Sequence, residues 1–219
     1  QVSMPIVFLS AETDPATQYG ALMTGGDDFI VKPIPDQQLV FLVRSRAQRS
    51  RMLHDAMSRD SLTGLLKHTK IAEQLQVEVT RARRSGKPLS FAMLDIDHFK
   101  RVNDNYGHPA GDRVIRSLAQ MLRQRLRSTD SIGRYGGEEF AVVLPDTDSA
   151  GAGALLENLR DAFAALEFEA PGEVTFKATF SAGIVSATSL SAVQMTEAAD
   201  RALYAAKNGG RNRIVRVTE

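Results

Sequence analysis

Short apolar runs alternate with a helix-permissive stretch at the start of the chain. Residues 5–10 (PIVFLS) are apolar almost throughout and include β-branched members, which is typical of a strand buried on both faces of a parallel sheet. Residues 14–25 permit a helix, and residues 28–31 (DFIV) read as a second short strand. Asp36 is then placed to cap a helix that begins at Gln37. The pattern predicts a βαβα arrangement.

The next segment predicts one long helix. No proline or glycine interrupts residues 37–59, and apolar residues recur there at helical spacing. Such a helix would make a stiff connector that could pair with its twin, although its apolar positions are too irregular to predict a coiled coil. We interpret its arginines as a solvated helix face, with an anionic partner as the alternative: Arg44, Arg46, Arg49 and Arg51.

From Asp60 onward, helical and strand-like periods alternate. Helices are expected at residues 69–85, 111–126, 150–166 and 192–208, and strands at 89–96, 131–134, 139–144, 175–186 and 213–217. The second and third of these strands flank a tight turn at Gly136 and Gly137, where a two-residue loop requires positive φ, and they predict a hairpin. A hairpin joined to flanking βα units indicates the α+β class, an antiparallel-rich sheet with helices on one face.

Composition removes several classes of function. The 219 residues carry 27 Lys and Arg against 26 Asp and Glu, so no net field draws the chain to nucleic acid or to an anionic membrane. The absence of cysteine excludes thiol chemistry, and the four histidines lack the spacing of a paired metal motif. No apolar run approaches the length of a membrane span, and no signal pattern opens the sequence. We expect a soluble cytoplasmic protein, or the soluble part of a larger one, with no nucleic-acid or membrane partner.

Acidic residues gather where two predicted strands begin or end. Glu138 and Glu139 directly follow the glycine pair, whose lack of side chains lets a phosphate or a base approach the backbone. Asp95 and Asp97 close the apolar strand 89–96, and strand alternation places both side chains on one face. Two aspartates that face a glutamate from a neighbouring hairpin form an oxygen-rich site suited to Mg²⁺. The sequence lacks the glycine-rich loop of a P-loop NTPase, which disfavours that class.

Six ordered motifs now resemble those of one known family. They are 60–65 (DSLTGL), 95–100 (DIDHFK), 103–104 (ND), 106–112 (YGHPAGD), 136–140 (GGEEF) and 207–212 (KNGGRN). Together they resemble the GGDEF domain of diguanylate cyclases, in its GGEEF form. The resemblance implies an α+β domain over residues 60–219 with the ferredoxin-like, palm-like nucleotidyl-cyclase fold. It also implies an enzyme that condenses two GTP into cyclic di-GMP and two pyrophosphates.

The resemblance assigns roles by motif position. It implies Asp95, Glu138 and Glu139 as catalytic residues, and it implies that Mg²⁺, with Mn²⁺ as an alternative, binds Asp95, Glu138 and the Ile96 carbonyl. Glu139 would be a second metal ligand or an aid to deprotonation. The implied GTP-binding residues are Asn103 and Asp112 for guanine, Lys207 and Arg211 for the triphosphate, Phe99 and Lys100 near it, and Gly136 and Gly137 against the nucleotide. A carboxylate beside an amide is the chemistry that guanine selection over adenine requires.

The resemblance further implies a homodimer and feedback by the product. Each domain would hold one GTP, so two domains must meet face to face, and dimer geometry would be the control point. Arg127 and Asp130 form an Arg-x-x-Asp motif five residues before Gly136, which implies an inhibitory site for cyclic di-GMP. The chain departs from the family pattern at Asn158, where a further arginine often completes that site, with Arg160 two residues on.

Residues 1–45 resemble the C-terminal part of a response-regulator receiver domain, and residues 46–59 would be a helical linker. Ser10 matches the hydroxyl residue that ends the fourth receiver strand, and Lys32 and Pro33 match the lysine and cis-proline after the fifth. The phosphate-accepting aspartate of a receiver lies in the half that precedes these residues. The resemblance implies that the chain is the signalling output of a two-component response regulator. A histidine kinase would act on it through the full receiver domain.

Two other functions are alternatives. A catalytically silent GGDEF module would bind GTP or cyclic di-GMP as a receptor, but silent members usually carry changes in the glycine turn or at the metal aspartate. Asp95 and the turn at 136–140 are intact here. A response regulator with a DNA-binding output is the weaker alternative, because no basic recognition helix follows residue 60.

Overall fold

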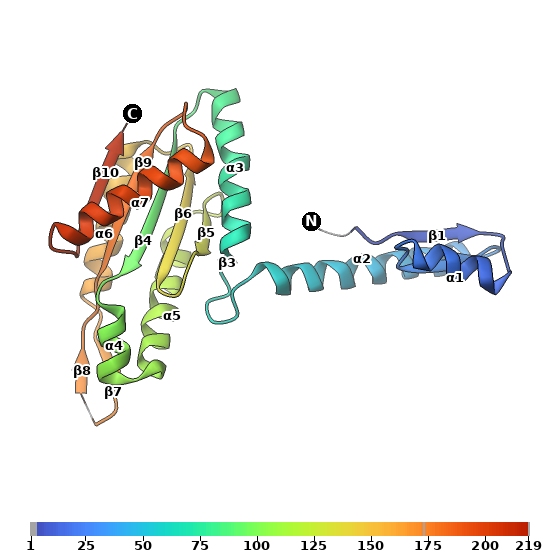
Figure 1. Cartoon of the computed structure of the whole chain (residues 1–219), viewed down its shortest axis with the longest axis horizontal. Helices are drawn as coiled ribbons and strands as arrows, with labels where there is room; N and C mark the ends of the chain where they lie inside the picture. The colour runs from blue at the N-terminus through green and yellow to red at the C-terminus, as the bar shows by residue number, and fades with distance from the viewer. Residues whose placement is uncertain (1–3, 173, 219) are drawn as a thin grey trace. The chain divides into compact units, whose positions relative to one another are not determined.

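The computed structural model describes residues 4–172 and 174–218, without the side chains of 53–57 and of Thr218 (Figure 1). The backbone contacts divide the chain into two compact units, Gln1–Ser58 and Arg59–Glu219. Each unit has its own sheet, so each is described by itself.

The first unit contains the predicted βαβα order. Strands β1 (Val7–Ser10) and β2 (Asp28–Val31) pair in parallel. Helix α1 (Pro15–Met23) joins them and begins after Asp14, whose side chain caps it by accepting a backbone hydrogen bond. Helix α2 (Asp36–Ser58) follows, so the long uninterrupted helix expected from the sequence is present.

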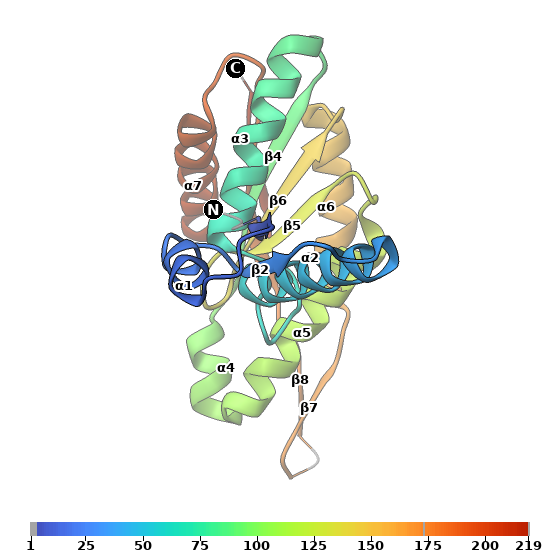
Figure 2. The same cartoon turned by 90° about the vertical axis from the view of Figure 1, so that its right-hand side faces the viewer.

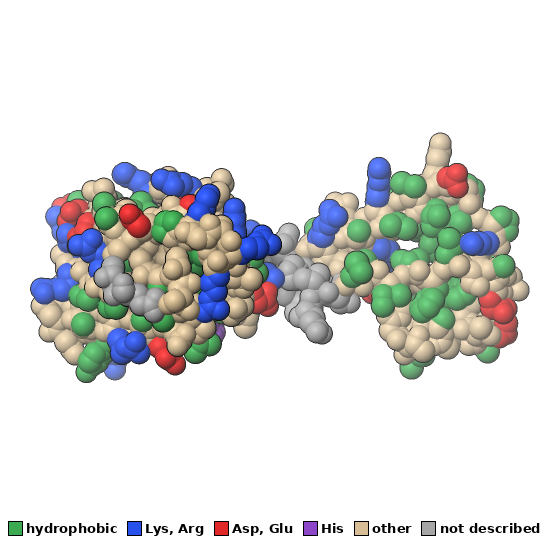
Figure 3. Space-filling model, turned by 90° about the horizontal axis from the view of Figure 1, so that it is seen from above, with side chains coloured by type: hydrophobic (Ala, Val, Ile, Leu, Met, Phe, Trp, Pro, Cys, Tyr) green, Lys and Arg blue, Asp and Glu red, His purple; other side chains and the backbone are tan. Residues whose placement is uncertain are grey.

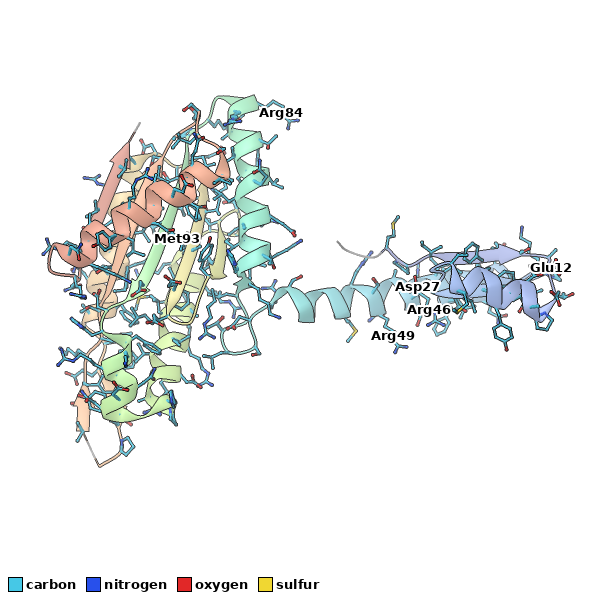
Figure 4. All side chains as sticks on the ribbon, in the orientation of Figure 1. Glu12, Asp27, Arg46, Arg49, Arg84 and Met93 are labelled. Carbon is cyan, nitrogen blue, oxygen red and sulfur yellow. The ribbon has the colours of Figure 1, made fainter. Side chains whose placement is uncertain are left out.

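The arginines of α2 do not form one uniform solvated face. The Nη2 of Arg46 lies 2.7 Å from Oδ2 of Asp28, and its Nε donates to the same oxygen at 2.9 Å. Arg44, Arg49 and Arg51 are exposed, as the interpretation of a solvated face expects; Arg46 and Arg49 are labelled in Figure 4. Arg46 therefore ties α2 to β2 within the first unit.

Hydrophobic side chains gather on the surface of the first unit (Figure 3). Met23 is 88% exposed and Phe41 is 70% exposed, and Ile30 is the one buried hydrophobic residue among the described side chains of this unit. The unit therefore has almost no core of its own. Despite its apolar surface residues, neither α2 nor any other helix within 4–172 and 174–218 has the length and apolar character needed to cross a membrane.

A six-stranded sheet forms the second unit, in the order β10-β9-β4-β6-β5-β3. Its strands are β3 (Leu66–Lys67), β4 (Leu89–Ile96), β5 (Ser131–Arg134), β6 (Glu139–Pro145), β9 (Phe180–Ser186) and β10 (Ile214–Thr218). Strand β4 pairs antiparallel with β6 and β9, and β5 pairs antiparallel with β6. The two edge strands pair in parallel with their neighbours. This mostly antiparallel sheet confirms the predicted α+β class.

Helices cover both faces of this sheet, so the expectation of helices on one face is wrong. Helices α3 (His68–Ser85) and α7 (Ala192–Asn208) pack on one face, and α5 (His108–Arg125) and α6 (Ser149–Ala164) pack on the other (Figure 2). Every residue of β4 is buried. A strand that is apolar at nearly every position is typical of a sheet covered on both sides, which explains the correction.

The two cores meet at the central strand. Phe91 and Met93 of β4 pack with α3 and α7, whereas Ala92 and Leu94 pack with α5 and α6 (Met93 is labelled in Figure 4). Gly183 of β9 lets α7 approach closely, because a Cβ there would collide with the α7 backbone. The sheet end that carries Asp95 is therefore held rigidly between packed layers.

Two segments differ from the predicted elements. Helix α4 (Phe99–Tyr106) lies where no element is predicted, because its eight residues give little more than two turns of periodicity. The predicted strand 175–186 is divided into β9 and a separate strand β8 (Val174–Phe176), which pairs with β7 (Phe168–Ala170). The ring of Phe176 stacks on that of Tyr106, with centroids 4.2 Å apart. This aromatic contact holds the β7–β8 hairpin against α4, so β8 does not extend β9.

Candidate active site

Asp95 lies buried at the end of β4, on the face that α7 covers. Its Oδ2 lies 2.7 Å from Nζ of Lys207, in the last turn of α7, and its side chain is 9% exposed. Burial raises the pKa of Asp95, while the hydrogen bond and the charge of Lys207 oppose that rise. One carboxylate and one ammonium group therefore meet at the end of the central strand.

The hairpin turn brings both glutamates to the same strand end. Glu139 is directly opposite Asp95 in the β4–β6 register, and the N–H of Ile96 donates to the carbonyl oxygen of Glu138 at 3.3 Å. Both glutamate side chains are half-buried. Burial, and after it the charge of Asp95, raises the pKa of Glu139. The three residues expected to be catalytic thus lie at one end of the sheet.

The glycine pair reverses the chain without positive φ, so that expectation is wrong. The loop is longer than two residues: the N–H groups of Tyr135 and Gly136 both donate to the carbonyl oxygen of Glu139, at 2.8 and 3.3 Å. A Cβ on Gly136 would collide with the Glu139 carboxylate, whereas a Cβ on Gly137 would meet no atom within 4 Å. Gly136 makes room for Glu139, and Gly137 leaves exposed backbone that a ligand can approach.

The corner between α4 and α5 brings Asn103 and Asp112 together. Gly111 packs so closely against Asn103 that a Cβ would collide with the Oδ1 of that amide. Asp112 follows Gly111 directly, and both Asn103 and Asp112 are half-buried. Helix α4 begins with Phe99 and Lys100, two residues after the Asp97 that follows β4. The amide and carboxylate expected to bind guanine therefore share one corner, joined to the end of β4.

Asp200 is a further acid of the site that the motifs do not single out. It lies on α7 two helical turns before Lys207, so the two side chains share a helix face. Asp200 is exposed, but partial desolvation by its neighbours raises its pKa, and the charge of Lys207 opposes the rise. Burial, followed by the charge of Asp200, raises the pKa of Tyr135 in the glycine turn. The seven-residue spacing from Lys207 places Asp200 on the same helix face, but nothing else in the sequence marks it as part of the site.

Asp97 lies near Asp95, as the sequence predicts, and its charge contributes to the raised pKa of Asp95 after the larger effects of burial and Lys207. Its buried carboxylate accepts hydrogen bonds from Thr179 Oγ1, from Ser181 Oγ and from the backbone N–H of Asn212. Ser181 is directly opposite Asp95 in the β4–β9 register, so Asp97 bonds to a residue on the face that carries Asp95. The Asp97 carboxylate is therefore occupied by donors from β9 and from the segments around it.

Arg134 connects the glycine turn to the first motif of the second unit. Its Nη1 lies 3.1 Å from both carboxylate oxygens of Asp60, and its Nε and Nη2 donate to the Gly137 carbonyl at 3.1 and 2.7 Å. The Asp60 carboxylate also accepts from the N–H and the hydroxyl of Thr63. These bonds fix the backbone of Gly137, the exposed residue of the turn.

The Arg-x-x-Asp motif lies at the opposite end of β5 from the glycine turn. The N–H of Arg127 donates to Oδ2 of Asp130 at 2.8 Å, and the N–H of Asp130 donates to the Arg127 carbonyl at 3.0 Å. Burial raises the pKa of Asp130, and the Arg127 side chain is exposed. Arg160 donates to Asn212 and is ion-paired on its own helix, so it is engaged away from this motif.

The oxygen atoms expected to hold a metal are chemically suited to Mg²⁺. Among the described side chains, no group of three or more carboxylates and histidines is arranged to hold a metal ion. The expected set is smaller: the carboxylates of Asp95 and Glu138 and the carbonyl of Ile96, all hard oxygen donors. The backbone bond between Ile96 and Glu138 holds these two segments together. A cation would also stabilise the crowded carboxylates whose burial raises the pKa of Asp95 and Glu139.

Fold and site together define an α+β domain of the palm-like nucleotidyl-cyclase class, with acids at the end of its central antiparallel strand and an exposed glycine turn beside them. Residues 57–213 match the family model described as diguanylate cyclase, GGDEF domain. The chain belongs to this GGDEF family.

Several known proteins are similar to the chain. It is 44% identical over 186 residues to diguanylate cyclase DgcP of Pseudomonas aeruginosa, which covers 81% of this chain and 28% of DgcP. It is 34% identical over 226 residues to response regulator PleD of Caulobacter vibrioides, which covers 97% of this chain and 50% of PleD. The crystal structure of the GGDEF domain of DgcB from Caulobacter crescentus, in complex with c-di-GMP, matches with a TM-score of 0.71 and 33% identity, over 73% of this chain and 93% of that chain. The chain spans half or less of the two curated relatives.

Proposed function

We propose that the chain is a diguanylate cyclase, which condenses two GTP into cyclic di-GMP with release of two pyrophosphates. The observation that carries the proposal is the meeting of Asp95, Glu139 and Lys207 at the end of β4, beside Glu138. Acids that can hold a cation, next to a fixed ammonium group, are what the transfer of a nucleotidyl group to a hydroxyl requires. The name of the relative DgcP supports the same reaction.

The corner between α4 and α5 selects guanine in this proposal. The Asp112 carboxylate accepts from N1–H and N2–H of guanine, and the Asn103 amide serves O6 or N3. Adenine lacks that pair of donors, so it would leave the carboxylate unpaired and bind more weakly. Gly111 supports this role because its missing side chain is what lets Asn103 lie against the start of α5.

Cationic groups bind the triphosphate. Lys207 has three N–H donors, so it can bind a phosphate oxygen while it keeps its ion pair with Asp95. Arg211 binds the outer phosphates, and the first N–H groups of α4, at Phe99 and Lys100, donate to the same oxygens. The backbone of Gly136 and Gly137 lies against the nucleotide.

The reaction joins two bound nucleotides at their sugar and phosphate ends. Mg²⁺ or Mn²⁺, held by Asp95, Glu138 and the Ile96 carbonyl, would polarise the α-phosphate and stabilise the charge that develops on it. The 3′-oxygen of one GTP bonds to the α-phosphorus of the other, the bond to the bridging oxygen breaks, and pyrophosphate leaves. The hydroxyl proton passes to Glu139, whose raised pKa makes it a better proton acceptor. Repetition with the roles exchanged closes the ring.

Catalysis in this proposal needs two copies of the chain and responds to two signals. Each copy holds one GTP, so a homodimer must bring two sites face to face.

Cyclic di-GMP inhibits by binding the Arg127 guanidinium and the Asp130 carboxylate. The similarity to response regulator PleD supports a response-regulator role in which a histidine kinase acts through a full receiver domain. Helix α2 would then carry the signal.

The test is product analysis after removal of bound nucleotide. The chain is incubated with GTP and Mg²⁺, and in parallel with ATP, and the products are separated by chromatography and identified by mass. We expect cyclic di-GMP and pyrophosphate from GTP, no product from ATP, and a KM for GTP raised about tenfold or more in Asp112→Ala. Tight binding of GTP or cyclic di-GMP without any product, also in a chain dimerised by a fused coiled coil, would instead establish a silent receptor.

A further inference from the structure

The turn that carries Arg211 has an unfavourable backbone. Arg211 and Asn212 both have left-handed φ values, 63° and 45°, and they follow Gly210 at 116°. Two consecutive non-glycine residues in this region are costly, and such conformations persist only where the surrounding structure holds them. The groups that hold this turn therefore decide where the Arg211 side chain points.

Asp97 holds the turn from inside the domain. Its Oδ2 accepts the Asn212 backbone N–H at 2.9 Å and the Thr179 hydroxyl at 2.7 Å, and its Oδ1 accepts the Ser181 hydroxyl at 2.7 Å. The residue is only 4% exposed, so the carboxylate is fixed by three donors from two segments. A buried carboxylate of this kind gives a short, strong bond to the strained peptide.

Arg160 holds the same turn from α6. Its Nη1 donates to Oδ1 of Asn212 at 2.9 Å, while its Nε and Nη2 are bound by Glu157 at 2.8 Å and Asp161 at 2.6 Å. The Arg160 side chain is 17% exposed. Both polar ends of Asn212, its backbone N–H and its side-chain oxygen, are thus bound by charged groups that are themselves anchored.

We propose that Asp97 and Arg160 are positioning residues that hold the Arg211–Asn212 turn in its left-handed form, so that Arg211 faces the triphosphate of GTP. The proposal rests on the proposed function, because it assigns GTP to the site beside Asp95. The turn follows α7 directly, so Arg211 lies four residues after Lys207, whose Nζ is 2.7 Å from Oδ2 of Asp95. Asp97 thereby has a task separate from metal binding, and Arg160 has one separate from the Arg-x-x-Asp motif.

The test compares a triphosphate with a monophosphate of the same base. Calorimetry in Mg²⁺ measures the affinities of the αβ-methylene analogue of GTP, which cannot release pyrophosphate, and of GMP. We expect Asp97→Asn to weaken binding of the analogue about tenfold and to leave GMP binding unchanged. In an Arg211→Ala background, Asp97→Asn should weaken the analogue no further, because the arginine that it positions is gone.

Two further variants keep the proposal falsifiable. Ser90→Ala removes another buried polar side chain from the far end of β4 and should change neither affinity. Arg160 lies outside the core, and Arg160→Ala should weaken binding of the analogue about threefold with no effect on GMP binding. If circular dichroism shows that Asp97→Asn does not fold, Arg160→Ala is the variant that tests the proposal. Equal losses for both nucleotides, or a full additional loss in the Arg211→Ala background, would overturn the proposal. Failure of the unsubstituted chain to bind the analogue would instead overturn the proposed function.

Discussion

We expect the Glu138 side chain to matter greatly for turnover, because the proposed reaction assigns it to the metal ion, and to matter little for the fold. It is half-buried in a turn, and its carbonyl oxygen, which bonds to Ile96, is unaffected by truncation of the side chain. We expect Glu138→Ala to lower the rate of cyclic di-GMP formation by about three orders of magnitude, or about 4 kcal/mol of transition-state stabilisation, at an unchanged melting temperature. The exposed Glu197 of α7 offers a matched control, Glu197→Ala, which should retain full activity. Activity that survives in Glu138→Ala would remove this residue from the metal site.

Glu139 links the site to the pH dependence of stability. Burial first and the charge of Asp95 second raise its pKa above the usual 4.5. The folded protein therefore holds this proton more tightly than the unfolded chain does, so stability falls as the pH rises from 4.5 through the raised pKa. Glu139→Gln removes the charge and should raise the melting temperature by roughly 1 to 3 °C at pH 7.5, with the difference vanishing below pH 4.5. A melting temperature that rises equally at both pH values would contradict the repulsion between Glu139 and Asp95.

At the scale of elements, Arg134 joins strand β5 to the glycine turn and to the motif that begins the domain. Arg134→Ala should lower the free energy of unfolding by about 2 kcal/mol, since it removes bonds to the Asp60 carboxylate and to the Gly137 carbonyl. It should also slow turnover, because Gly137 is no longer fixed. Enzyme kinetics and chemical denaturation measure both effects.

Arg123 is the matched control for that prediction. It donates to the Gly64 carbonyl in the same first motif but, among the residues that the structure describes, not to the glycine turn. Arg123→Ala should leave turnover unchanged. If both variants slowed the reaction equally, the effect would belong to the first motif and not to the position of Gly137.

Some elements could be predicted from the sequence because a local pattern of residues determines each of them. Strand β4 is apolar at six of its eight positions, and the hairpin is marked by its glycines. Helix α7 has a capping box at Ser191 and a regular apolar stripe. These elements therefore have the predicted type and place. Helix α4 is too short for its periodicity to show in the sequence. Strand β8 is separated from β9 by the contact of Phe176 with Tyr106, two residues far apart in the chain. Local patterns carry no information about such contacts.

In the candidate site, too, the sequence predicts some features, and only the three-dimensional structure reveals the others. Its acids and glycines follow from motif positions, and the register of β4 and β6 brings Glu139 opposite Asp95. The partners of Asp97 could not be predicted, because Thr179 and Asn212 reach it only through tertiary folding. Sequence spacing assigns a residue to an element, but the three-dimensional arrangement decides which groups its side chain meets.

At the scale of the whole molecule, product inhibition should depend on the Arg127 side chain, whereas the initial rate of the reaction should not. Arg127→Ala should raise the concentration of cyclic di-GMP needed for half inhibition about tenfold or more, and leave the initial rate unchanged. The backbone N–H of Arg127 still donates to Asp130, so the turn remains folded. Inhibition curves with added cyclic di-GMP measure the effect, and an unchanged curve would place the inhibitory site elsewhere.

The most direct measurement of the central claim is the initial rate of cyclic di-GMP formation from GTP and Mg²⁺ at a series of protein concentrations. In the proposed reaction, two copies of the chain, each with one GTP, must meet before the first bond forms. We expect a rate that rises faster than linearly with protein concentration, and two pyrophosphates for each cyclic di-GMP. A rate strictly proportional to protein concentration for a chain that remains monomeric would contradict the two-copy reaction, and no product from a chain with enforced dimerisation would contradict the cyclase itself.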